Sequence, residues 1–146
     1  MRAVIQRSKN SSVVVDGEIV GEINSGMVVL ACFEKGDTEE NVKKAIYKLI
    51  NVRMFDCIET KKMNINIKQA KGEILVISQF TLSWNGEKGH RPGFENSLDP
   101  LNAKILYEKF CFGLEQEGVK VAQGIFGAYM IVNITNDGPV TLFLTF

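Results

Sequence analysis

The apolar run Ile74-Leu75-Val76-Ile77, followed by Ser78-Gln79-Phe80-Thr81-Leu82, organises the fold predicted for this chain. Four consecutive aliphatic residues predict a strand buried on both faces. Three hydrogen-bonding side chains stand where the strand ends, and a long polar loop, residues 83–100, follows them. Polar groups at the end of a buried strand, beneath such a loop, are a common way to build a site. The alternative is that the hydroxyls only satisfy nearby backbone groups.

The composition is that of an ordinary globular protein of one domain, residues 1–146. The chain is 45% hydrophobic and 23% charged, and 17 basic side chains balance 17 acidic ones. Net charge therefore does not indicate a nucleic-acid-binding protein, although a local patch on a neutral chain would suffice. No apolar run approaches the ~20 residues that cross a bilayer, and the first seven residues do not resemble a signal peptide. Three distant cysteines (Cys32, Cys57 and Cys111) fit reduced cytoplasmic thiols better than disulfides or a zinc site.

The first third of the chain predicts an antiparallel meander. Strands are expected over residues 2–8, 12–15, 19–23 and 27–33. Asp16-Gly17 is a strong hairpin signal, and residues 24–26 predict another turn.

Two helices are predicted. Asp37 or Thr38 is expected to cap the first, which runs to about Asn51 with an apolar stripe at helical spacing. Pro100 suits the first turn of the second, and Gly118 ends it. The expected core face of the second helix is Leu101, Ile105, Leu106, Phe110 and Leu114.

Between the helices, residues 52–55 and 63–67 predict short strands. Four lysines, at positions 61, 62, 68 and 71, make this region basic. A solvated edge that resists strand pairing and a contact with RNA are both open interpretations.

The last part of the chain predicts strands over residues 119–122, 128–135 and 140–146. The motif Asn136-Asp137-Gly138-Pro139 is expected either as a plain turn between two strands or as a rigid unit that presents carbonyls for binding. Both faces of residues 140–146 carry large apolar residues, so a second subunit is the simplest cover. Together these elements predict an α+β fold: a largely antiparallel sheet, curled towards a barrel, with two packed helices.

The sequence contains no glycine-rich phosphate loop and no dinucleotide fingerprint. Its only histidine, His90, would have to serve Ser78 or Thr81 in a serine-hydrolase relay, and a loop is a poor scaffold for a general base. An RNA-binding domain without hydrolytic activity is a further alternative, but no exposed aromatic platform stands out in the sequence.

Two motifs taken together resemble the D-aminoacyl-tRNA deacylases, also called D-Tyr-tRNA(Tyr) deacylases. They are Ser-Gln-Phe-Thr-Leu, complete at residues 78–82, and Asn-x-Gly-Pro-x-Thr, complete at residues 136–141. The resemblance extends over the whole chain, including residues 1–7, 15–17, 34–38, 106–108 and 124–128. One departure is Gly93, where the family usually has Ser or Asp. Lys88 and Arg91 in this loop are candidates either for tRNA phosphates or for a loop salt bridge.

The resemblance implies a cytoplasmic homodimer that hydrolyses the ester of D-aminoacyl-tRNA, and of glycine mischarged on tRNA(Ala), without a metal or cofactor. It implies that the Gly138–Pro139 bond is cis, that this unit reaches the partner's site, and that Arg7 holds it in place. It assigns catalysis to Ser78, Gln79, Phe80 and Thr81, and substrate binding to Gly138, Pro139, Ala103, Asn136 and Met130. Two mechanisms are open: covalent attack by Thr81, which has no obvious base, or positioning of the ester while the terminal adenosine 2′-hydroxyl helps to activate water.

Overall fold

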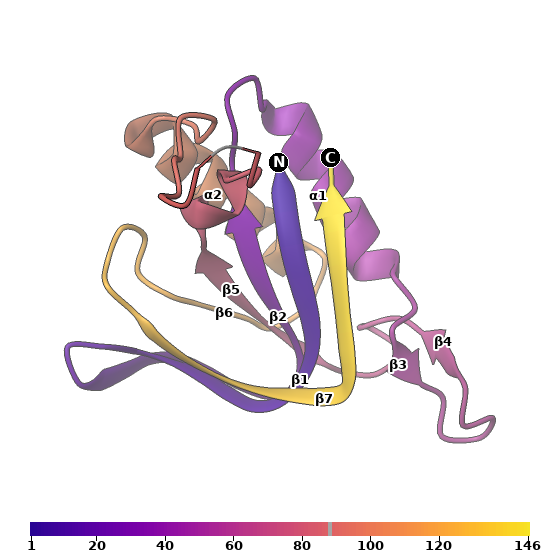
Figure 1. The fold of residues 1–146 in the computed structure, drawn as a ribbon. Coiled ribbons are helices and arrows are strands. Elements are labelled where there is room, and N and C mark those ends of the chain that lie inside the picture. The colour runs from indigo at the N-terminus through magenta and orange to yellow at the C-terminus, as the bar shows by residue number, and fades with distance from the viewer. Residues whose placement is uncertain (88) are drawn as a thin grey trace.

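The computed structural model describes residues 1–87 and 89–146, which form a five-stranded sheet, a small two-stranded sheet and two α-helices (Figure 1). The large sheet contains β1 (Arg2–Val15), β2 (Glu18–Cys32), β5 (Glu73–Ser78), β6 (Val121–Gln123) and β7 (Ile131–Thr145), in the order β6-β5-β2-β1-β7. The small sheet pairs β3 (Phe55–Asp56) with β4 (Met63–Ile65). The helices are α1 (Glu39–Asn51) and α2 (Pro100–Gln116), and a short 3-10 helix, η1 (Phe80–Ser83), follows β5.

The sheet is mixed, so the prediction of a largely antiparallel sheet is confirmed only in part. β1 pairs antiparallel with β2 and β7, whereas β5 pairs parallel with β2 and β6. Parallel neighbours require long crossovers, and α1 and α2 each lie in one of them. In the part of the chain that the structure describes, β6 and β7 are the two edges of an open sheet, and no closed barrel forms. The α+β class with two helices is confirmed.

The N-terminal third forms one long hairpin, so the predicted meander of four shorter strands is wrong. The register runs from Arg2 opposite Cys32 to Val15 opposite Glu18, and only the Asp16-Gly17 turn interrupts the chain. Residues 24–26, which the sequence predicts as a turn, stay within β2, and Gly26 lies opposite Ser8 in the ladder. The two strands therefore bend together without separating (Figure 1). Gly26 has φ +152°, and a Cβ there would lie 1.8 Å from the Glu73 carbonyl oxygen, so only glycine fits against the start of β5.

Both helices begin where the sequence predicts. The Thr38 N–H donates to Asn41 Oδ1 at 2.9 Å at the start of α1, and Asp99 Oδ1 accepts from the Asn102 N–H at 3.1 Å at the start of α2. The predicted core face of α2 is partly wrong, because Leu101 and Ile105 are 72% and 42% exposed. The buried residues of α2 are Ala103, Leu106, Tyr107, Phe110, Cys111 and Leu114. The Tyr107 hydroxyl donates to the buried carbonyl of Val76 at 3.0 Å, which orients this face toward the sheet.

Strand β5 is buried on both faces, as predicted. One face joins the main core beneath the two helices. On the other face, Leu75 and Ile77 pack in a second cluster with Val13 and Ile23, which the curled ends of β1 and β2 supply. Partly buried residues at the start of β7 and just before it pack against this cluster: Met130, Val132 and Ile134.

Strand β7 is continuous, so the predicted turn between two strands at residues 136–139 is wrong. Both halves of β7 pair with β1: Gln6 lies opposite Thr141 and Ser8 opposite Asn136. Residues 137–140 thus form a bulge opposite the single residue Arg7, at the sharp bend of β7 (Figure 1). Asn136 Nδ2 donates to the carbonyl oxygens of Arg7 and Val140, both at 3.0 Å, and so closes the bulge at its base.

Candidate active site

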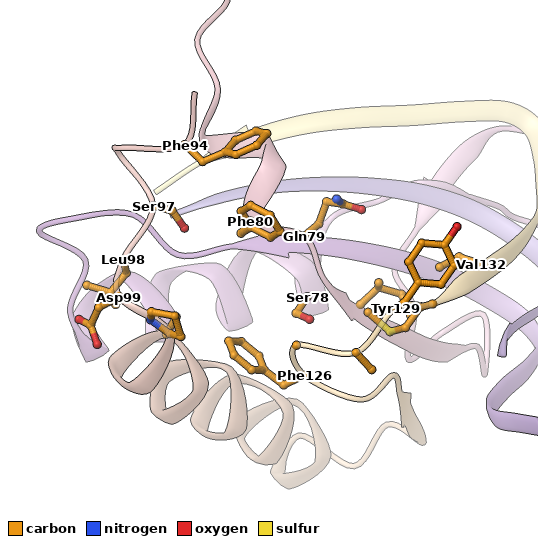
Figure 2. A pocket seen from close by; sticks show the side chains of 16 residues that line it. Ser78, Gln79, Phe80, Phe94, Ser97, Leu98, Asp99, Phe126, Tyr129 and Val132 are labelled. Atoms are coloured by element: carbon orange, nitrogen blue, oxygen red, sulfur yellow. The ribbon is translucent and has the colours of Figure 1, made fainter. Parts of the chain in front are cut away.

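A cavity of about 620 Å³ opens at the carboxyl end of β5 (Figure 2). Four segments meet there: the end of β5 with the start of η1, the loop before α2, the first turn of α2, and the segment that leads into β7. The residues that line it are Ile77, Ser78, Gln79, Phe80, Phe94, Ser97, Leu98, Asp99, Pro100, Ala103, Phe126, Gly127, Ala128, Tyr129, Met130 and Val132. A mostly apolar cavity with a few polar groups is typical of small-ligand sites.

The chain turns sharply at the cavity wall. The Gln79 N–H still donates to the Ala31 carbonyl at 2.8 Å, as in the ladder between β5 and β2. The chain then enters η1, which two other segments support. Arg2 Nη1 donates to the Leu82 carbonyl at 3.0 Å, and Cys32 Sγ donates to the Phe80 carbonyl at 3.5 Å. These contacts hold the Ser78–Leu82 motif in one conformation beside the cavity.

Gln79 and Thr81 are hydrogen-bonded to each other. Gln79 Nε2 donates to Thr81 Oγ1 at 2.5 Å, and both side chains are half-buried. A neutral amide donates this bond and cannot accept a proton from the hydroxyl. The contact therefore orients Thr81 without activating it as a nucleophile.

Aromatic rings surround the cavity mouth. Phe80 is 57% exposed and meets Phe94 edge to face, with ring centroids 5.0 Å apart. Tyr129 is 89% exposed on the other side (Figure 2). The expectation that the chain offers no exposed aromatic platform is therefore wrong. These rings come from three separate segments, so no local pattern in the sequence could have indicated the cluster.

The bulge in β7 is held by one buried arginine. The Gly138–Pro139 peptide bond is cis, as the resemblance implies. Arg7 Nε donates to the Asp137 carbonyl at 3.1 Å, and Arg7 Nη1 donates to the Met54 carbonyl at 3.2 Å. Asp137 Oδ2 and Asp56 Oδ2 lie 3.4 and 3.2 Å from the same guanidinium. Arg7 thus fixes the bulge against the segment that leads into β3.

A model of the D-Tyr-tRNA(Tyr) deacylase family matches residues 4–145. The chain belongs to this family. The D-aminoacyl-tRNA deacylase of Aquifex aeolicus (strain VF5) is 51% identical over 144 residues, which cover 99% of this chain and 97% of that one. The family predicted from the two motifs is confirmed.

Two solved structures share this fold. The structure named c-Myc DNA Unwinding Element Binding Protein superposes with a TM-score of 0.92 at 36% identity, covering 99% of this chain and 98% of that one. A probable eukaryotic D-amino acid tRNA deacylase superposes with a TM-score of 0.82 at 18% identity, covering 98% and 97%. The second similarity shows the shared fold alone.

The structure brings together only some of the residues that the family resemblance assigns to the site. Ser78, Gln79, Phe80, Ala103 and Met130 line one cavity. The other five (Arg7, Thr81, Asn136, Gly138 and Pro139) are not among the lining residues of the same chain. His90 is exposed and does not line the cavity either, and Lys88 lies outside the described residues.

The buried thiols and phenol near the site are poor nucleophiles. Burial raises the pKa of the Cys32 thiol to about 11 and that of the Cys111 thiol to about 12. Burial also raises the pKa of Tyr107 well above its ordinary value. All three therefore stay protonated near neutral pH and act as structural groups.

Within residues 1–87 and 89–146, no group of three or more His, Cys, Asp or Glu side chains is placed to hold a metal ion. Neither α-helix is both long and apolar enough to cross a bilayer.

Proposed function

We propose that residues 1–146 act as one domain that hydrolyses the ester bond of D-aminoacyl-tRNA and releases free D-amino acid and tRNA. The observation that carries this proposal is the cavity beside Ser78, Gln79 and Phe80 in a chain of the deacylase family. A volume of about 620 Å³ suits the aminoacyl end of a tRNA, not a whole RNA helix. The remainder of the tRNA must then lie outside the cavity.

The active form in this proposal is a cytoplasmic homodimer. Gly138 and Pro139 are exposed on edge strand β7 and do not line the cavity of their own chain. Phe143, four residues further along β7, is 59% exposed on one face of this strand. A second copy related by twofold symmetry would bury this face and bring each bulge to the other copy's cavity.

Chiral selection follows from the chemistry of the Gly138–Pro139 unit. A carbonyl oxygen at Gly138 can accept a hydrogen bond from the substrate ammonium, and the Pro139 ring supplies a rigid wall. An L-residue held by the same ammonium would direct its side chain into that wall. A ten-thousandfold preference requires about 5.5 kcal/mol, which a clash in a rigid pocket can supply. Glycine has no side chain to clash, so glycyl-tRNA(Ala) is a second substrate in this proposal.

The proposed chemistry is positioning of an already labile ester. Thr81 Oγ1 accepts a hydrogen bond from the Gln79 amide, which is no general base. The motif at the end of β5 would hold the ester and stabilise the oxyanion, while the 2′-hydroxyl of the terminal adenosine helps to activate water. Thr81 then contributes orientation and no covalent bond.

Ester release from matched D-Tyr-tRNA and L-Tyr-tRNA, with wild type and Thr81→Ala side by side, tests this function. We expect wild type to cleave the D-ester alone and Thr81→Ala to retain activity within about a hundredfold, as expected for the loss of one or two orienting hydrogen bonds. Complete loss in Thr81→Ala with the fold intact would support covalent catalysis. Cleavage of neither ester by wild type would contradict the proposed activity.

The matched control variant is His90→Ala. A Ser78–His90 relay requires near-total loss of activity in this variant. The deacylase mechanism proposed above predicts less than a twofold change, because His90 does not line the cavity. The two mechanisms are therefore separated by one additional rate measurement.

A further inference from the structure

Residues 43–62, which we call the basic segment, concentrate positive charge in a chain whose net charge is zero. The segment contains most of α1 and the turn between β3 and β4. Its six basic residues are Lys43, Lys44, Lys48, Arg53, Lys61 and Lys62, and its two acidic residues are Asp56 and Glu59. All six basic side chains are exposed. Asp56 already contacts Arg7 at 3.2 Å and neutralises none of them.

Five of the seven described lysines outside the basic segment form ion pairs, and only Lys35 and Lys71 do not. Lys68 contacts Glu117 at 2.6 Å and Lys120 contacts Glu73 at 3.0 Å. Within residues 1–87 and 89–146, none of the six basic side chains of the segment forms an ion pair. Lys61 and Lys62 lie in the turn between β3 and β4, so protection of a strand edge does not explain them.

The surface of α1 within the basic segment contains a hollow. Lys43, Lys44, Tyr47 and Lys48 line a shallow surface cavity with Glu40 and Phe146. Three ammonium groups and an exposed phenol at one hollow match a chain of phosphate oxygens, which accept hydrogen bonds and carry negative charge.

The cavity at the end of β5 cannot bind the RNA backbone by itself. Asp99 is the one charged residue among the described residues that line it. Affinity for a nucleic acid depends on neutralising its phosphates with Lys and Arg. Cations outside the cavity must therefore meet the backbone of a tRNA whose 3′ end is inside.

The basic segment is fixed next to the bulge in β7. Arg7 donates to the Met54 carbonyl at 3.2 Å and contacts Asp56, while its Nε donates to the Asp137 carbonyl at 3.1 Å. Figure 1 shows β3 and β4 beside the bend of β7, with α1 leading away from them. The turn that carries Lys61 and Lys62 extends outward from this same corner of the molecule (Figure 1).

We propose that the basic segment binds the acceptor-stem phosphates of the tRNA whose 3′ end occupies the partner's cavity. This inference rests on the proposed function, in which the bulge of one subunit reaches the cavity of the other. Lys61 and Lys62 contact the phosphates nearest the 3′ end, and the lysines of α1 contact the stem beyond them. The contacts are to the backbone, so they add affinity for every tRNA without selecting a sequence.

The test compares two double variants that remove the same charge. Lys61→Ala/Lys62→Ala removes two unpaired lysines of the basic segment, and Lys68→Ala/Lys120→Ala removes two lysines that carboxylates already neutralise. The substrates are D-Tyr-tRNA and D-tyrosyl-adenosine, which has the ester but no RNA backbone. In the first variant we expect KM for D-Tyr-tRNA to rise about tenfold and the slope of log KM against log salt to fall by about 1 to 2. Its kcat, and its hydrolysis of D-tyrosyl-adenosine, should equal those of the control variant.

The outcomes separate this inference from the proposed function. Equal KM values for D-Tyr-tRNA in the two variants would overturn the role of the basic segment and leave the deacylase activity intact. Equal loss on both substrates would overturn it as well, because the lysines would then support the bulge and not the RNA. If wild type cleaved neither substrate, the deacylase proposal would fail. The Kd for uncharged tRNA still tests the basic segment, with about tenfold weaker binding expected in the first variant only.

Discussion

The two motifs of this chain lie in contrasting regions of the molecule. Ser78-Gln79-Phe80-Thr81-Leu82 follows the most buried strand, β5, and its first three residues line a cavity of the same chain. Asn136-Asp137-Gly138-Pro139-Val140-Thr141 lies in edge strand β7, where it bulges away from the ladder. The first motif follows a strand that has neighbours on both sides, and Ala31, Cys32 and Arg2 hold it through hydrogen bonds. The second is placed by a few side-chain hydrogen bonds, chiefly those of Arg7 and Asn136.

In the proposed mechanism, this difference indicates how the two motifs contribute to activity. A motif at the end of a buried strand inherits the rigidity of the core. A motif on an edge strand can be offered to another molecule, but its geometry then depends on local support. Variants that remove the support of the bulge should therefore impair activity without altering the cavity.

The largest effect is expected from Arg7→Ala. This change removes donors to the Asp137 and Met54 carbonyls and the ion pairs with Asp56 and Asp137. We expect kcat/KM for D-Tyr-tRNA to fall by about a hundredfold, and the free energy of unfolding in urea to fall by about 3 kcal/mol. The control is Lys9→Ala, which removes an exposed contact to Asp137 and should change stability by less than about 0.5 kcal/mol. Equal effects in both variants would contradict the role assigned to Arg7.

A smaller effect is expected from Asn136→Ala. The amide donates to the Arg7 and Val140 carbonyls, and its removal leaves the base of the bulge open. We expect a loss of about 1 to 2 kcal/mol in unfolding free energy and about a tenfold loss of kcat/KM. Asn133→Ala removes a single exposed bond to Ser12 Oγ at 3.3 Å and should have little effect on either. Full activity in Asn136→Ala would show that the bulge needs no closure at its base.

Gly124→Ala perturbs the cavity, which lies beside the first motif. A Cβ at this position would lie 2.5 Å from Met130 Sδ and 3.3 Å from Ile77 Cδ1. Because a methionine side chain is flexible, it should move into the cavity at a cost below about 1 kcal/mol. We expect KM to rise several-fold with kcat nearly unchanged. A large loss of stability with normal KM would show that the segment before β7 cannot adjust in this way.

The last prediction concerns the reactivity of the Cys57 thiol. Cys57 follows Asp56, which forms an ion pair with Arg7. N–H and hydroxyl groups of Thr60 and the N–H of Glu59 lower the pKa of its thiol, whereas burial raises the pKa of Cys32 to about 11 and of Cys111 to about 12. A thiol reagent at pH 7 should label Cys57 alone in the folded protein and all three cysteines in denaturant. The labelling rate should rise with pH as the thiolate forms and reach half of its maximum below the pKa of an ordinary cysteine. Cys32 supports η1 through its hydrogen bond to the Phe80 carbonyl. Labelling of Cys32 at a similar rate would contradict the rigidity of this support.

Local sequence signals predicted several elements well. The burial of β5, the start of α1 at Thr38 and the Asp16-Gly17 turn each depend on a few neighbouring residues, so they can be identified from the sequence. The core face of α2 was harder to predict, because Leu101 and Ile105 have the right spacing but are 72% and 42% exposed. Periodicity indicates a face, whereas the neighbouring elements decide its width.

Long-range pairing could not be predicted in the same way. Gly26 and residues 136–139 carry ordinary turn signals, yet both lie inside continuous strands. In each case the partner strand decides the outcome: Ser8 of β1 lies opposite Gly26, and Arg7 lies opposite the bulge. The parallel pairing of β5 likewise depends on crossovers through the helices, which no local pattern records.

The sequence by itself determined the family, because two complete motifs stand in a chain that resembles the family over almost its whole length. It also determined the main helices and the most buried strand, since capping and hydrophobic periodicity act over a few residues. Only the tertiary structure decided that five of the ten predicted site residues line one cavity and that the other five lie elsewhere in the chain. Only the structure showed that Arg7 joins the bulge to the basic segment. These contacts link residues up to 130 positions apart, and the energy that decides them comes from packing and hydrogen bonds that exist only after the chain has folded.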